Sequence, residues 1–142
     1  MTPDGVALAA IVILLFPIGY FFLASPAFLL VKLDIPPVTQ LLGGMFSVHF
    51  LMLRVTTVIA MMVFAATRRP AFALGVGLIA ALAFWGRGWF MQRWNAALSA
   101  RDAGNPDAVR RLRRLHWTGM LSNAVVLVAV VASIPYVSAS SS

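Results

Sequence analysis

Five polar side chains stand inside long apolar stretches of this 142-residue sequence and could bind a ligand or a partner: His49, Arg54, Arg87, His116 and Asn123. An arginine keeps its proton in a protein, and a charge at bilayer depth is costly. A compensating group must therefore meet Arg54, which lies mid-way along an apolar run. The candidates are backbone carbonyls, a water-filled cleft, an anionic ligand, or a carboxylate of another protein.

The sequence offers no carboxylate for this purpose. It contains no Glu, and its four acids fall at the amino terminus or in connecting segments: Asp4, Asp34, Asp102 and Asp107. Proton relays built from Asp or Glu are thus excluded within the membrane. Cys is also absent, and neither a Ser-His-acid set nor a metal-binding set of side chains is visible. We therefore predict a protein that is not an enzyme and has no metal site.

The two histidines raise haem b as an alternative cofactor, since two transmembrane histidines can hold one iron. His49 is expected about 8 Å deeper in the membrane than His116, which makes a shared iron awkward. His116, next to Arg113, Arg114 and Trp117, is expected at the head-group boundary. The sequence thus favours no cofactor, with haem b as the alternative.

The polar residues can be grouped by their expected depth in the membrane and by the helix face on which they lie. A rise of about 1.5 Å per residue puts Ser25, His49, Arg87 and Asn123 in one layer, with Arg54 just above it. On the second helix His49 is turned about 140° from Arg54, so the two need not face one cleft. A clear inward stripe is predicted on the last helix, where small and polar residues favour helix contact: His116, Gly119, Asn123, Val126 and Val130.

The elements that carry these residues are predicted to be four transmembrane helices. The chain is 61% hydrophobic and 11% charged, with a mean hydropathy of +0.92, whereas soluble domains are about a quarter charged. Apolar stretches at 6–31, 41–66, 71–90 and 115–137 each suffice to span a bilayer. The first lacks the features of a cleaved signal peptide. We predict one all-α domain over 1–142, a polytopic integral membrane protein folded as an antiparallel four-helix bundle, with a basic loop at 93–114 and a disordered tail at 138–142.

The net charge of +7 follows the predicted membrane boundaries and does not indicate nucleic acid binding. Basic residues gather in the first and third connections, while the second offers only Arg68 and Arg69. The positive-inside rule then places both termini outside the cytoplasm of a bacterial inner membrane. Five arginines are expected to contact anionic lipid head groups: Arg93, Arg110, Arg111, Arg113 and Arg114. The four tryptophans are expected in an interfacial belt, and the glycines of the third helix at close-packed positions: Gly75, Gly77, Gly86 and Gly88.

The segment 110–128 contains an arginine-rich stretch, a Leu-His pair at 115–116, and Asn123 seven residues after His116. With Ser25-Pro26 and Phe28, it resembles a family of uncharacterised bacterial four-helix membrane proteins similar to the eukaryotic transmembrane protein 205. The resemblance implies a four-helix bundle and little chemistry. Arg54 does not belong to the shared pattern.

Three functions are compatible with these features. The leading prediction is a non-catalytic accessory subunit that docks on other membrane protein subunits through the cationic layer. The first alternative is a binding or transport protein for a small anionic or amphipathic ligand, with that layer lining a pocket. The second alternative is a b-type haem protein that uses His49 and His116.

Overall fold

The computed structural model describes residues 2–139, and this part of the chain is all-helical. Four long helices follow one another: α1 (Pro3–Ala24), α2 (Pro36–Ala66), α3 (Pro70–Asp102) and α4 (Ala108–Ala139), with a short 3₁₀ helix, η1 (Ser25–Leu29), continuing α1. Each of the four, with η1 counted as part of the first, is long and apolar enough to cross a membrane. The predicted all-α class and its four apolar helices are therefore confirmed.

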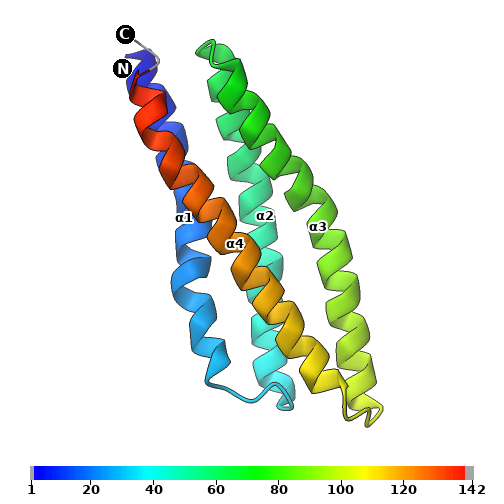
Figure 1. The fold of residues 1–142 in the computed structure, drawn as a ribbon. Coiled ribbons are helices and arrows are strands. Elements are labelled where there is room, and N and C mark those ends of the chain that lie inside the picture. Colours follow the sequence, from blue (N-terminus) through cyan, green and yellow to red (C-terminus); the bar gives the residue numbers. More distant parts are fainter. Residues whose placement is uncertain (1, 140–142) are drawn as a thin grey trace.

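The helices run to and fro between two ends of the molecule (Figure 1). One end, called here the terminal end, holds both chain termini and the connection between α2 and α3. The other, called the basic end, holds the connections 30–35 and 103–107 and most of the arginines. Helix α4 passes diagonally in front of α2, from beside α3 at the basic end to beside α1 at the terminal end (Figure 1). It therefore contacts both outer helices.

Two packed clusters fill the interior, one near each end. The cluster toward the terminal end includes small side chains of α1, among them Ala7 and Ala10, packed with aliphatic residues and Phe64. The cluster toward the basic end is aromatic and includes Phe21, Phe46 and Trp94. Lipid is as apolar as these side chains, so close packing and hydrogen bonds between helices, more than burial from water, must hold such a bundle together in a membrane.

Helix α3 is longer than predicted, because it includes residues 93–102 of the expected basic loop at 93–114; the helical stretch predicted from Ala108 into the fourth span is present as the start of α4. Only residues 103–107 separate α3 from α4. The apolar pattern continues past the hydrophobic run, because Phe90, Trp94 and Ala97 recur at helical spacing and are all buried. Polar residues on the opposite face lower the mean hydropathy without ending the helix. At the start of α4 the Asn105 side chain accepts a 2.9 Å hydrogen bond from the Asp107 N–H.

The carboxyl ends of α2 and α3 have the same backbone motif. After α3, Gly104 adopts a φ of 85°, and the N–H of Asn105 donates to the carbonyl of Ala100 at 3.0 Å. After α2, Arg68 adopts a φ of 57°, and the N–H of Arg69 donates to the carbonyl of Phe64 at 2.8 Å. Both are Schellman ends, a motif that favours glycine at the left-handed position. The second end has an arginine there instead.

Three other predicted boundaries also differ. The first α-helix ends at Ala24 and not near residue 31, because Pro26 has no N–H for an α-helical bond and the chain tightens into η1. Helix α2 begins at Pro36, five residues before its predicted start, since prolines suit a first helical turn. The tail predicted to be disordered at 138–142 begins within α4, which includes Ser138 and Ala139. The rest of that tail lies outside the described residues.

Candidate functional site

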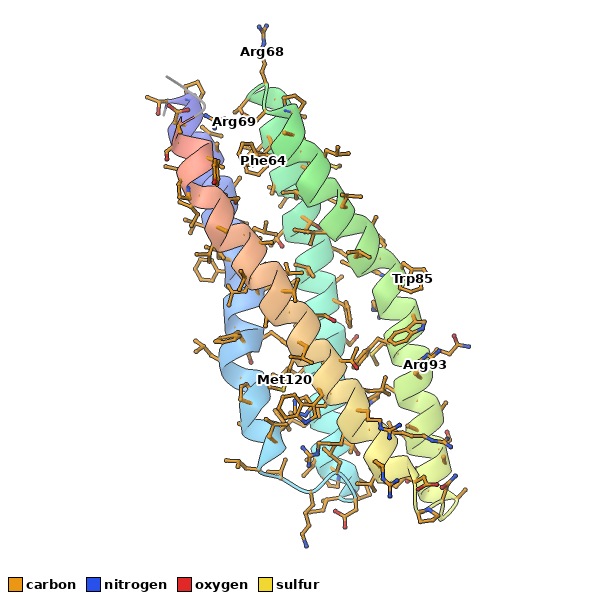
Figure 2. The ribbon with its side chains drawn as sticks, viewed as in Figure 1. Phe64, Arg68, Arg69, Trp85, Arg93 and Met120 are labelled. Carbon is orange, nitrogen blue, oxygen red and sulfur yellow. The ribbon has the colours of Figure 1, made fainter. Side chains whose placement is uncertain are left out.

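A cleft of about 430 Å³ lies between α2, α3 and α4, with Phe21 of α1 contributing to its wall. Its lining is mainly aromatic and aliphatic, and none of the described residues that form it is charged. The aromatic members come from three helices, α1, α2 and α3: Phe21, Phe46, Phe50, Trp85, Trp89 and Phe90. Trp85 is 66% exposed and extends from α3 (Figure 2). Aromatic rings therefore form much of the cleft wall, and one of them, that of Trp85, is exposed at the surface. Its volume is within the range of small-molecule sites.

Four polar side chains line the same cleft, and two of them are satisfied by their own helix. Thr118 donates to the carbonyl of Arg114 at 2.9 Å, and Ser122 donates to the carbonyl of Thr118 at 2.7 Å. The other two are His49 and Asn123. They come from α2 and α4, respectively.

His49 is 8% exposed and has a buried Nδ1 atom without a hydrogen-bond partner among the described residues. Its ring lies on that of Phe21, with centroids 4.3 Å apart. Asn123 is also buried, and its Nδ2 donates to the carbonyl of Ile18 at 3.0 Å. That bond joins α4 to α1, as expected for an amide at a helix contact. His49 therefore keeps unused hydrogen-bonding capacity beside the cleft.

Gly119 makes room for one of the rings of the cleft. A Cβ atom at this position would lie 2.5 Å from Cε1 of Phe46, closer than such atoms approach in real structures. The room expected at Gly119 is therefore present, but the Phe46 side chain fills it in place of a neighbouring helix. The glycines of α3 were predicted at close-packed positions. This prediction is wrong for Gly75 and Gly88, because a Cβ at either residue would meet no described atom within 4 Å. Hydrophobic context alone does not show which side of a helix is packed.

The inward stripe predicted on α4 is confirmed. His116, Asn123 and Val130 are buried, with Gly119 and Val126 partly exposed. His116 is 0% exposed, so its side chain lies inside the bundle and does not contact lipid head groups directly. His116 lies on the same face of α4 as the other buried residues. Its position on this face determines its burial more than its nearness in sequence to the arginines does.

The His116 ring joins α4 to the end of α1. Its Nε2 atom lies 3.0 Å from both the hydroxyl and the carbonyl oxygen of Ser25, which is itself buried. The rings of Phe28 and Phe46 lie nearly perpendicular to the imidazole. Binding haem iron through Nε2 would require these contacts to break. The arrangement indicates a structural role for His116.

Arg54 and Arg87 lie outside the cleft, along the contact between α2 and α3. Nη2 of Arg54 donates to the carbonyl of Phe84 at 3.1 Å, and its guanidinium carbon lies 4.6 Å from the centroid of the Phe84 ring. Nη2 of Arg87 lies 3.5 Å from the hydroxyl of Ser47. The predicted polar layer therefore separates into three places: His49 and Asn123 at the cleft, Ser25 and His116 between α1 and α4, and the two arginines at the α2–α3 contact.

The five arginines expected to contact lipid head groups differ from one another. Arg93, Arg110, Arg111 and Arg114 are exposed at the basic end, and Arg93 stacks on the Trp89 ring at 4.4 Å. Figure 2 shows the Arg93 side chain directed away from the bundle. Arg113 donates to the carbonyls of Phe28 and Val31, both at 2.7 Å. Because these carbonyls lie at the end of η1, Arg113 acts as a cap for that turn.

Two further arginines, which were not predicted as site residues, connect segments of the chain that are far apart in sequence. Arg69 is buried at the terminal end, where it pairs with Asp4 and donates to the carbonyl of Val137. In Figure 2 it turns into the bundle, while Arg68 points away. At the basic end, Arg101 donates to the hydroxyl of Thr39 at 2.6 Å. Both residues join segments far apart in sequence, so spacing along the chain gave no signal for them.

Trp94 corrects the expectation of an interfacial belt. It is 1% exposed and stacks on Phe90 with the rings 14° from parallel. Gly43 faces it, and a Cβ there would lie 2.8 Å from the indole nitrogen. Trp85 and Trp117 are exposed. Trp94 is therefore a core residue that pairs with a glycine of α2.

Comparison with known proteins gives no match: no family model, no curated protein and no solved structure matches the chain. The resemblance to the four-helix family around transmembrane protein 205 therefore stays a prediction.

Proposed function

We propose that this protein is an integral membrane protein whose four antiparallel helices bind a small, uncharged, amphipathic molecule without transforming it. The observation that carries the proposal is the aromatic cleft with the Nδ1 atom of His49 beside it, which has no hydrogen-bond partner within residues 2–139. An apolar cavity with one or two polar groups is typical of small-molecule sites. The apolar wall would hold the body of the ligand, and His49 would bond its polar group.

The charge of the ligand follows from the lining. The cleft has no charged wall residue, and Arg54 and Arg87 lie elsewhere. An anion would lose its hydration there without gaining a counter-charge, which is costly in a low dielectric. Of the two ligand classes predicted from the sequence, the geometry thus favours an amphipathic ligand over an anionic one. A hydroxyl on an apolar body would suit His49, because the other ring nitrogen bonds the Pro17 carbonyl and this leaves Nδ1 of the neutral imidazole as an acceptor.

The direction of access follows from exposure. Trp85, Ser122 and Val125 line the cleft and are exposed on the sides of α3 and α4, near the middle of each helix. In a bilayer these positions would face the hydrocarbon, so a ligand dissolved in lipid would reach the site laterally. A binding role also requires no activated nucleophile, and the hydroxyls of Thr118 and Ser122 are bonded to carbonyls of α4.

Location and orientation remain as predicted from the charges. The basic end would face the cytoplasm of a bacterial inner membrane, because Lys and Arg favour that side. Both termini would then lie outside. The exposed arginines Arg93, Arg110, Arg111 and Arg114 would contact anionic head groups at the basic end.

A direct test uses 2-naphthol as the probe and the purified protein in lipid nanodiscs. Equilibrium dialysis is expected to show saturable binding above partition into empty nanodiscs. Replacing Ser122 by Trp fills the side of the cleft and is expected to weaken binding at least tenfold. Val128→Phe adds bulk at an exposed position of the same helix that does not line the cleft, and it should bind like the wild type. Equal loss in both variants, or no saturable binding by the wild type, would contradict the proposal.

The accessory-subunit function predicted from the sequence has separate support. Arg54 and Arg87 lie at the middle of their helices with most of their hydrogen-bonding capacity unused. The two arginines lie on a different surface of the molecule from the cleft.

A further inference from the structure

Two groups of arginines differ in how well the chain itself satisfies them. Arg69, Arg101 and Arg113 lie near helix ends, and each bonds to at least two oxygen atoms. Arg54 makes one side-chain hydrogen bond and Arg87 makes one at 3.5 Å, and the Nε atom of each is buried without a partner. A guanidinium has five N–H donors. The two mid-helix arginines therefore lack acceptors among the described residues.

Their depth makes lipid head groups poor candidates for the missing acceptors. Arg54 lies 12 residues from the last residue of α2 and 18 from the first, which corresponds to about 18 and 27 Å along the helix. Arg87 is similarly central in α3. The hydrocarbon core is about 30 Å thick, so Arg54 lies deep within it if α2 spans the bilayer. The acceptor must then reach the same depth.

Both arginines lie along one flank of the molecule. On α2, Arg54 follows Ser47 by seven residues, two helical turns that bring both to one face. On α3, Arg87 follows Phe84 by three residues and shares its side of the helix. The flank also includes exposed apolar surface, with Leu51 50% and Phe84 52% exposed. Beside Arg87, Gly88 has no atom within 4 Å of a Cβ position. A helix could therefore approach closely here.

A second copy of this chain cannot supply the counter-charge. All four carboxylates lie at helix ends or in connections, and none falls in the middle of a helix. A carboxylate at mid-membrane depth must then come from a different protein. An ion pair between a guanidinium and a carboxylate lowers the cost that either charge carries alone in lipid.

We infer that the flank formed by Ser47, Arg54, Phe84 and Arg87 docks a transmembrane helix of another protein that carries an Asp or Glu near its middle. The apolar rim packs against that helix, the Arg54 guanidinium bonds its carboxylate, and Arg87 adds positive charge on the same flank. This surface is independent of the cleft, so the failure of either proposal leaves the other intact.

The test uses synthetic leucine-alanine helices of about 23 residues, long enough to span a bilayer. One helix carries a single central Asp and its matched control carries Asn at the same place. Association with donor-labelled protein is measured by energy transfer in phosphatidylcholine vesicles. The Asp helix is expected to associate at least tenfold more tightly than the Asn helix. Equal association of the two would overturn the inference, and this comparison needs no variant of the protein.

Variants then locate the contact. Arg54→Leu is expected to remove the preference for Asp, Arg87→Leu to reduce it, and Arg54→Lys to retain part of it because the charge is kept. Arg93→Leu, at an exposed arginine of the basic end, should leave the preference unchanged. Adding phosphatidylglycerol to the vesicles tests lipid as the source of negative charge. If anionic lipid abolishes the preference, or if Arg93→Leu removes it as fully as Arg54→Leu, the inference is wrong.

Discussion

The Nε2 atom of His116 lies 3.0 Å from the hydroxyl oxygen of Ser25, although 91 residues separate the two in the chain. This bond fixes α4 against the turn that ends α1. The same nitrogen lies 3.0 Å from the Ser25 carbonyl, and both residues are fully buried. The pair thus aligns α4, which also carries Gly119 and Asn123 to the cleft.

Removing the imidazole should destabilise the bundle more than removing the hydroxyl. Ser25→Ala leaves the carbonyl as a partner of His116 and is expected to cost about 1 kcal/mol. His116→Leu keeps the volume but removes the ring nitrogen that contacts both Ser25 oxygens, with an expected loss of about 2–3 kcal/mol. Reversible unfolding in bicelles measures both values. Additive losses in the double variant would show that the two side chains are not coupled.

Gly119→Ala should destabilise the protein by overpacking. The added Cβ would lie 2.5 Å from the Phe46 ring, and relief requires a shift of that ring or of α4. Such strain costs about 1–3 kcal/mol. Gly75→Ala, where the space is open, should be neutral or slightly stabilising because alanine favours helix. Restoration of stability by Phe46→Leu in the Gly119→Ala background would identify the ring as the cause. A Gly119→Ala protein as stable as the wild type would contradict the packing.

Arg68→Gly should stabilise the protein. Arg68 has a φ of 57° at the end of α2, points away from the bundle (Figure 2), and so loses no packing when replaced. Glycine adopts the left-handed conformation without strain, but it also increases the conformational entropy of the unfolded chain. The first contribution is expected to exceed the second, so that the free energy of unfolding rises by about 0.5–1 kcal/mol. Gly104→Ala is the reciprocal control, since it places a Cβ at a φ of 85° and should lower stability. An unchanged or lower midpoint for Arg68→Gly in thermal unfolding would refute this.

The sequence was sufficient for the features that repeat along one helix. The seven-residue spacing from His116 to Asn123 to Val130 predicted the buried face of α4, and the apolar runs predicted the number of helices. The end of α3 was missed because residues 91–102 form an amphipathic extension, whose polar face masks its buried Trp94. Hydropathy averages over both faces of a helix and therefore ends the prediction too early.

The site was less predictable because it depends on contacts between helices. Depth placed His49 and Arg87 in one layer, yet one lines the cleft and the other lies at the α2–α3 contact. Rotation about each helix axis decides this, and packing sets that rotation. The partners of Arg69 and Arg113 lie 65 to 85 residues away in the chain, and no local pattern specifies them.

The selectivity of the cleft for a hydroxyl group tests the proposed function most directly. Naphthalene and 2-naphthol share one apolar body and differ in a single hydroxyl. After correction for partition into empty nanodiscs, the wild type should prefer 2-naphthol about tenfold, equivalent to about one hydrogen bond to a buried group. His49→Leu should bind both compounds equally, while Thr118→Val should keep the preference because that hydroxyl is bonded within α4. The same preference in His49→Leu as in the wild type would contradict the assignment of His49 as the polar group of the site.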